Sequence, residues 1–487
     1  MRGASPPGVA VEILTNPAED PRRAPDLSHL EVFNLTRARE VALSRLVMAY
    51  VSTGLVFMLL PGTFLGVWNL IKISGRESLA SISPAWLQAH GHAQVFGWVG
   101  SFILGIGFYS VPKLRGTARG AFAAAWACWV MWTAGVSLRW FANIYAWHWR
   151  ALLPLSAALE MAAFAIFFYV VSRHRPAPSG TGRRPQGSCQ ASLDPWVWVV
   201  ASASTGLALS LVGNLAACLG LALHGADPAF AHGFDQRYLA LVAWGFLVPF
   251  VWGFSAKWMP TFLGLAPTRP RLLLAAVAAN AAGVLVTLAG WGGAATWIFA
   301  AGAALAIIAL RIFEPSPKEP KTRGVHSTFP FFIRAAYGWL LVAALLQVAA
   351  ARWDFSGGLW GASRHALTVG FIAVMVLSVG QRILPAFAAM RLLWSTRLMF
   401  VALALVSTGC ALRVSSEILA YQDYAAWAWS VLPASALLEL AGLTAFAVNI
   451  FGTFLSSAAT SRPSPWWLVS REKARSGWAW SAPGHTG

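Results

Sequence analysis

Two histidines of this chain stand at corresponding places in two similar segments. His92 opens the run His-Ala-Gln-Val-Phe-Gly, and His365 opens the run His-Ala-Leu-Thr-Val-Gly. A neutral imidazole is a good ligand for haem iron or copper, especially where a bilayer excludes competing water. The pattern suggests two imidazoles that hold one haem iron from opposite faces; the alternative is two interfacial histidines that share only ancestry. A glycine and later a proline follow both histidines at equal offsets (Gly97, Pro112, Gly370, Pro385). The glycine would admit a flat macrocycle or a neighbouring helix.

Charged residues follow each histidine in the next two predicted helices. Arg139 and Glu160 follow His92, and Arg413 and Glu439 follow His365 at matching places. Charges inside a bilayer are costly and usually face the bundle interior with a partner. One interpretation is an Arg–Glu pair within each unit. The other gives the arginines to haem propionates and the glutamates to proton movement, and both can hold together.

A third histidine, His90, stands two residues before His92. On a regular helix the two side chains point about 200° apart, so they face opposite ways. His90 is therefore a metal-ligand candidate for a second site, a copper site, and the alternative is a solvated interface histidine. Its partners there would come from three histidines near predicted helix ends (His148, His224, His232). The four cysteines show no paired spacing, so we expect neither a disulfide nor a thiolate cluster (Cys128, Cys189, Cys218, Cys410).

The elements that position these residues are predicted from hydropathy. Of the 487 residues, 57% are hydrophobic and only 11% are charged, whereas a soluble domain has about 25% charged residues. Apolar runs of about 20 residues recur, and each suits the ~30 Å hydrocarbon core. We predict an all-α, polytopic integral membrane protein with about twelve transmembrane helices at 45–71, 87–111, 120–143, 150–172, 195–222, 237–263, 271–290, 293–312, 331–351, 363–388, 398–418 and 429–455.

The twelve helices form three pseudo-repeated four-helix arcs. In the middle arc Ala240 stands at the histidine position, although Gly245 and Pro260 keep the offsets. The ordered series of matches indicates an internal repeat. The predicted organisation is a disordered cytosolic tail, three arcs with a mobile cytosolic linker after each of the first two, and a second cytosolic tail (1–44, 45–172, 173–194, 195–313, 314–330, 331–456, 457–487).

The net charge of +18 needs no nucleic acid to explain it. If both termini are cytoplasmic, most of the 36 Lys and Arg residues fall on the cytosolic side, as the positive-inside bias requires. We therefore predict a multi-pass protein whose partner is the lipid bilayer, with its basic face toward anionic lipid.

Three four-helix arcs with histidines on helices 2 and 10 resemble subunit I of the haem–copper oxidases. Subunit I uses two histidines on helix 10, one on helix 6 and a pair on helix 7. Here helix 10 has His365 alone, helix 6 has Ala240 at the repeat position, and helix 7 has no histidine. The usual binuclear haem–copper centre is therefore expected to be absent.

The His92 and His365 runs also resemble the NnrS family, bacterial membrane proteins associated with nitric oxide stress, over most of residues 45–455. The resemblance implies a bound haem and leaves copper open, and the repeat then suggests His92 and His365 as its ligands, with Arg139 and Arg413 at the propionates. It also implies a bacterial inner-membrane location, nitric oxide as a candidate ligand and a quinol or cytochrome electron donor. The alternatives are an oxidase-like, quinol-linked redox subunit, a cofactor-free transporter or channel, and a structural subunit. Enzymatic activity stays open.

Overall fold

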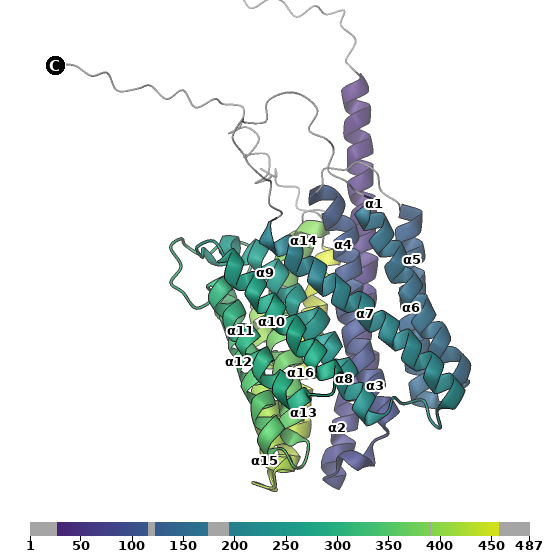
Figure 1. The fold of residues 1–487 in the computed structure, drawn as a ribbon. Coiled ribbons are helices and arrows are strands. Elements are labelled where there is room, and N and C mark those ends of the chain that lie inside the picture. Colours follow the sequence, from purple (N-terminus) through teal and green to yellow (C-terminus); the bar gives the residue numbers. More distant parts are fainter. Residues whose placement is uncertain (1–26, 115–121, 174–193, 389–390, 457–487) are drawn as a thin grey trace, which may run out of the picture.

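The structure is a computed structural model, and it describes residues 27–114, 122–173, 194–388 and 391–456. The described residues form a bundle of twelve long helical rods with no β-strand among them (Figure 1). Eleven of these rods are long and apolar enough to cross a membrane. The remaining rod, α5 (Phe122–Tyr145), contains Arg139 and four tryptophans. The predicted polytopic, all-α fold is confirmed.

The first arc contains four rods, of which the first two are interrupted by a π-helical segment and the last two are single α-helices. The first rod starts at Leu27, so it extends into the segment predicted as a tail, where good helix formers such as Leu, Ala, Arg and Glu are frequent. A short 3₁₀ turn, η2 (Leu79–Ser81), separates the first two rods. The elements are α1 (Leu27–Phe57), η1 (Met58–Phe64) and α2 (Leu65–Arg76), then α3 (Pro84–His92), η3 (Ala93–Gly100) and α4 (Ser101–Leu114), then α5 and α6 (Trp149–Ser172).

The second and third arcs repeat this organisation, except that their first rod is a single α-helix without a π-helical segment. The second arc contains α7 (Pro195–His224), the rod α8 (His232–Ala240), η4 (Leu241–Leu247) and α9 (Val248–Leu263), and then α10 (Pro270–Leu288) and α11 (Gly292–Leu310). The third arc contains α12 (Phe329–Trp353), the rod α13 (Gly358–His365), η5 (Ala366–Ala373) and α14 (Val374–Phe387), and then α15 (Thr396–Tyr421) and α16 (Ala428–Leu455).

The second rod of every arc changes from α- to π-type hydrogen bonding at the same repeat position. The π-helical segments η3, η4 and η5 each begin at the residue directly after the histidine position of the sequence repeat. π-helical turns are rare and occur mostly at functional sites. Their occurrence at the same repeat position in all three arcs is therefore not expected by chance. The sequence repeat therefore has a counterpart in backbone structure.

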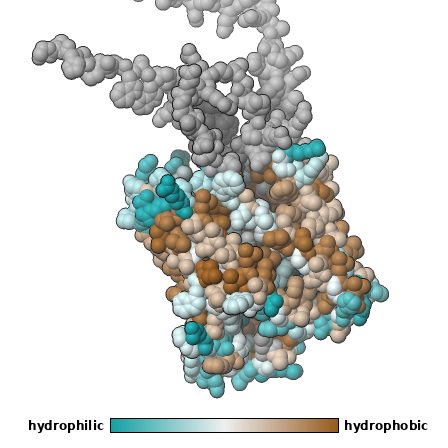
Figure 2. All heavy atoms as spheres, in the orientation of Figure 1, coloured by the Kyte–Doolittle hydropathy of each residue, from teal (hydrophilic) through white to brown (hydrophobic). Residues whose placement is uncertain are grey.

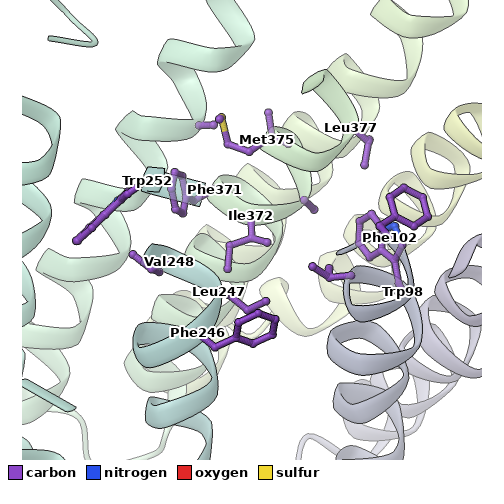
Figure 3. Close-up of a cluster of buried hydrophobic side chains, with 14 of the residues drawn as sticks. Trp98, Phe102, Phe246, Leu247, Val248, Trp252, Phe371, Ile372, Met375 and Leu377 are labelled. Atoms are coloured by element: carbon purple, nitrogen blue, oxygen red, sulfur yellow. The ribbon is translucent and has the colours of Figure 1, made fainter. Parts of the chain in front are cut away.

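The three arcs close on one another, because α6 packs on α7, α11 packs on α12, and α16 packs on η1 and α2. Large apolar side chains from all three arcs gather in the interior (Figure 3). Other apolar side chains are exposed in a broad band, with hydrophilic residues toward the two ends of the bundle (Figure 2). Such a band is what a lipid-facing surface requires. The interior cluster includes Trp98 and Phe102, Phe246 and Trp252, and Phe371 and Met375.

The linker between the second and third arcs, predicted at 314–330, is hydrogen-bonded to the bundle. The amide of Lys318 donates to the carbonyl of Gly264 at 3.2 Å, and that of Lys321 donates to Phe262 at 2.9 Å. These carbonyls end α9 and have no partner inside the helix, so the linker satisfies them. Glu314 adds a 2.9 Å ion pair with Arg269. The linker after the first arc lies outside the described residues, apart from its two ends.

Candidate functional site

His365 ends α13 and lies in a cluster of charged side chains within the third arc. Its Nδ1 lies 3.0 Å from the carbonyl oxygen of Gly361 and 3.1 Å from Oε2 of Glu417 on α15. The same Oε2 lies 3.3 Å from Nε of Arg413, one helical turn earlier on α15. Arg413 and Glu417 are buried, whereas the His365 side chain is 30% exposed. A carboxylate and a guanidinium therefore meet directly behind this imidazole.

Gly361 makes room for that carboxylate. A Cβ at this position would lie 2.1 Å from Oε1 of Glu417. Gly361 stands one turn before His365 on the same helix, so Glu417 occupies the space that a side chain would otherwise fill. The absence of a side chain at residue 361 thus places Glu417 against His365.

His90 faces the first helix rod on one side. Its Nδ1 lies 2.8 Å from the carbonyl oxygen of Gly62, and a Cβ at Gly66 would lie 2.7 Å from its Cε1. The ring also interacts electrostatically with His365 and Arg413. His90 belongs to the first arc in sequence, but in space it lies within reach of the charged cluster of the third arc.

His92 faces a different neighbour. Its Nε2 lies 2.7 Å from Oε1 of Glu160 on α6, and both side chains are buried. The ring stacks on Phe96 with ring centroids 4.7 Å apart. A Cβ at Gly135 would lie 2.8 Å from Cγ of Glu160, so this glycine makes room for the carboxylate. As the helical rotation predicted, His90 and His92 meet different helices.

Arg139 contacts the second arc. Its Nη1 lies 2.8 Å from Sγ of Cys218 and 3.4 Å from Oδ1 of Asn214, both on α7. Its guanidinium carbon lies 4.5 Å from the ring centroid of Phe230. Gln88 holds Phe230 in place, because its amide group bonds to the Phe230 carbonyl and amide at 3.0 and 2.9 Å. The guanidinium is therefore enclosed by protein groups.

The expected Arg–Glu pairs are not formed in the described part of the chain. Glu160 pairs with His92 instead of Arg139, and Arg413 pairs with Glu417 instead of Glu439. The reason is helix packing, which brings α3 to Glu160 and leaves Arg139 facing α7. Glu439 is buried beside Gly409, whose Cβ would lie 2.7 Å from its Cγ.

Glu439 lies near the same charged side chains as His365. It interacts electrostatically with His365, Arg413 and Glu417, and its buried Oε1 has no hydrogen-bond partner among the described residues. We name His90, His365, Arg413, Glu417 and Glu439 the third-arc polar cluster. A buried polar group without a partner is costly, so such an atom points to a group that completes the site.

A family model described as NnrS protein matches residues 47–457. The chain belongs to the NnrS family. The family that the sequence resemblance named is thereby confirmed. A search of curated proteins finds no match to the chain.

The fold of this NnrS-family protein is also similar to a solved structure, a cryo-EM structure of a haem–copper terminal oxidase dimer. The TM-score is 0.65 with 12% sequence identity, over 87% of this chain and 86% of that chain. At this identity the likeness shows a common fold. The expected distant similarity to the oxidases is therefore confirmed at the level of the fold.

The tautomers separate the histidines of this NnrS-family protein into two kinds. A carbonyl oxygen only accepts hydrogen bonds, so the carbonyls of Gly62 and Gly361 place the proton of His90 and His365 on Nδ1. In each ring this leaves the lone pair of Nε2 for a metal, the arrangement that metal-bound histidines usually show. In His92 it is Nε2 that contacts Glu160.

The arginines differ in the same way. Nη1 of Arg413 is buried without a hydrogen-bond partner among the described residues, whereas Nη1 of Arg139 contacts Cys218. Arg413 can therefore still donate to an added anionic group such as a haem propionate. The residues of the third-arc polar cluster fit an iron-bound, anionic macrocycle. Arg139 also has one buried nitrogen without a hydrogen-bond partner among the described residues, its Nε, but Cys218, Asn214 and Phe230 surround its guanidinium.

Gly97 and Gly370 serve helix packing. A Cβ at Gly97 would lie 2.8 Å from Cβ of Phe57, and one at Gly370 would lie 2.5 Å from Cγ of Trp339. Of the two roles expected for these glycines, close approach of a neighbouring helix is the one seen here. The glycines that touch His90 and Glu417 are Gly66 and Gly361 instead.

The copper site suggested for His90 is not assembled in the described residues. His148, His224 and His232 are exposed at helix ends, and no described group of three or more His, Cys, Asp or Glu side chains has the arrangement of a metal site. Cys128, Cys218 and Cys410 are free thiols, while Cys189 lies outside the described residues.

Glu417 is not among the site residues predicted from the sequence. It follows Arg413 by four residues in a predicted helix, so it lies on the same helical face, and this spacing is the signal that could have found it. The corresponding residue of the first arc is Asn143, which donates to the Pro228 carbonyl at 2.7 Å. The two outer arcs therefore differ at the position one helical turn after the repeat arginine.

Proposed function

We propose that this protein binds one haem between α3 and α13, with His90 and His365 as axial ligands, and that it uses the haem in redox chemistry linked to nitric oxide. The observation that carries the proposal is that a backbone carbonyl contacts Nδ1 of each imidazole, which leaves Nε2 of both rings for a metal. Family membership and the oxidase-like fold support it. The pair predicted from the sequence, His92 with His365, is the competing assignment.

The residues around the site would bind and orient the cofactor. The carbonyls of Gly62 and Gly361 fix the two rings, and Arg413 offers its free Nη1 to a propionate. Haem, when bound, supplies one-electron redox chemistry and a binding place for diatomic ligands. With two histidines as ligands a bound haem would suit electron transfer, and nitric oxide would have to compete with one of them for the iron.

The location and the electron donor complete the proposal. We place the protein in the bacterial inner membrane with both termini in the cytoplasm, because that orientation satisfies the positive-inside bias. A quinol from the bilayer or a cytochrome at its surface would supply electrons. Copper is not assigned to any residue, since the described part of the chain has no three-ligand cluster for it.

The test is an absorption spectrum of the detergent-purified protein from haem-supplied cells, first air-oxidised and then reduced with dithionite. The wild type is expected to show a Soret band and sharp reduced α and β bands. His90→Ala and His365→Ala are expected to lose the bis-histidine spectrum, whereas His92→Ala keeps it. Metal analysis of the same samples counts iron and copper per chain.

The outcomes separate the competing assignments. A spectrum lost in His92→Ala and kept in His90→Ala would establish the pair predicted from the sequence. A colourless wild-type protein would refute the haem proposal and leave transport as the working function. Addition of nitric oxide to the reduced wild type then tests the ligand, because displacement of a histidine shifts the Soret band.

A further inference from the structure

Glu417 stands where a carboxylate can control a metal-bound histidine. Its Oε2 lies 3.1 Å from Nδ1 of His365, the ring nitrogen opposite the one available for a metal. The carboxylate is buried, and its electrostatic partners include three basic side chains, namely Arg413, His365 and Arg364. The carboxylate of Glu417 therefore lies between the guanidinium of Arg413 and the ring of His365.

We propose that Glu417 is a positioning residue that orients His365 and increases the electron donation of its imidazole to a bound iron. The inference rests on the proposed function in one respect, the binding of haem iron by His365. A carboxylate beside the distal N–H of a metal-bound histidine, which here points to the Gly361 carbonyl, orients the ring and raises its basicity through its charge. A more basic axial ligand stabilises ferric over ferrous iron, so it lowers the reduction potential.

The packing around Glu417 is specific to this role. Gly361 leaves space for the carboxylate one turn before His365, where any side chain would collide with Oε1. Arg413 contacts the same Oε2 at 3.3 Å, so a cation also lies against this carboxylate. The first arc has Asn143 at the corresponding position, where it donates to a loop carbonyl instead. In the third arc the carboxylate beside the repeat histidine comes from α15, which also contains Arg413, whereas in the first arc Glu160 comes from α6 and Arg139 from α5.

His92 and Glu160 provide a matched comparison within the same chain. They also form a buried His–Glu contact, at 2.7 Å, but it engages Nε2 of a histidine outside the proposed ligand pair. The substitutions Glu417→Gln and Glu160→Gln each replace a carboxylate with an amide of the same shape. Only the change at Glu417 is expected to alter the iron's ligand.

The experiment is a spectroelectrochemical titration of the purified haem-loaded protein, with haem per chain measured on the same samples. In Glu417→Gln we expect haem to be retained and the reduction potential to rise. A tenfold loss of preference for ferric iron corresponds to about 59 mV for a one-electron couple. Glu160→Gln is expected to keep the wild-type potential.

A second variant protects the test against misfolding of the first. Gly361→Ala keeps the charge of Glu417 but forces its carboxylate away from His365, so it is also expected to raise the potential. A wild-type potential in haem-loaded Glu417→Gln or Gly361→Ala would overturn the inference. If the wild type holds no haem, the proposed function fails first. If haem is present but the potentials do not move, only the role of Glu417 fails.

Discussion

The substitution Gly66→Ala tests whether His90 is held as a ligand. A Cβ at residue 66 would lie 2.7 Å from Cε1 and 2.9 Å from Nδ1 of His90. Carbon atoms in contact prefer separations of about 3.5–4.0 Å, so the ring must move away from the first helix rod by about 1 Å. The bond between Nδ1 and the Gly62 carbonyl would then lengthen from 2.8 Å to about 3.8 Å, beyond hydrogen-bonding distance.

The expected cost follows from these two changes. Overpacking a filled site costs about 1–3 kcal/mol, and a lost hydrogen bond costs about 0.5–1.5 kcal/mol. Loss of the partner that orients a metal-bound histidine lowers metal affinity about 10–100-fold. We therefore expect Gly66→Ala to fold but to hold haem at least tenfold more weakly than the wild type.

The assay measures haem per chain after purification and then the transfer of haem to an excess of an acceptor protein. Gly91→Ala is the matched control, because residue 91 stands between His90 and His92 and a Cβ there meets nothing within 4 Å. The control is expected to retain haem as the wild type does. Equal retention by Gly66→Ala and Gly91→Ala would refute the reasoning that assigns His90 to the iron.

Three further predictions concern the first arc and its differences from the third. Glu160→Ala leaves His92 buried without its partner, which costs about 1–3 kcal/mol for an unsatisfied buried polar group, so the melting temperature in detergent should fall while the reduced spectrum stays unchanged. Gly135→Ala should also lower the melting temperature, by overpacking worth about 1–3 kcal/mol, because the new Cβ meets Cγ of Glu160 at 2.8 Å and a backbone oxygen at 3.0 Å; an unchanged melting temperature would contradict the close packing. Arg139→Ala should destabilise the protein without loss of haem, whereas Arg413→Ala should lower haem retention, and the opposite result in a haem-transfer assay would return the propionate role to Arg139.

The membrane fold was predictable because its cause is local. Each bilayer-spanning segment must satisfy its backbone hydrogen bonds internally, so every helix is visible as an apolar run of about 20 residues. The repeat was equally visible, since matching offsets in helices 2, 6 and 10 need no knowledge of packing. The opposed orientation of His90 and His92 followed from the rotation per residue of a helix alone.

The partners of the charged side chains were not predictable in the same way. Arg139 and Glu160 stand on consecutive helices and suggested a pair, but α3 brings His92 to Glu160, and the loop residue Phe230 covers Arg139. Glu417 passed unnoticed because its importance depends on Gly361, which is distant in sequence and lies on another helix. Such contacts depend on which face of each helix meets which neighbouring helix, and at which depth in the bundle.

The sequence by itself determined that this protein is a helical membrane protein of the NnrS family, with histidines at one repeat position of its outer arcs. Only the tertiary structure decided which histidine faces which arc. The last helix, α16, packs on η1 and α2 and closes the three arcs, and His90 lies within electrostatic reach of His365 and Arg413. Hydropathy is a property of each segment taken alone, whereas this arrangement arises from side chains of helices far apart in the chain packing together, and no local pattern encodes it.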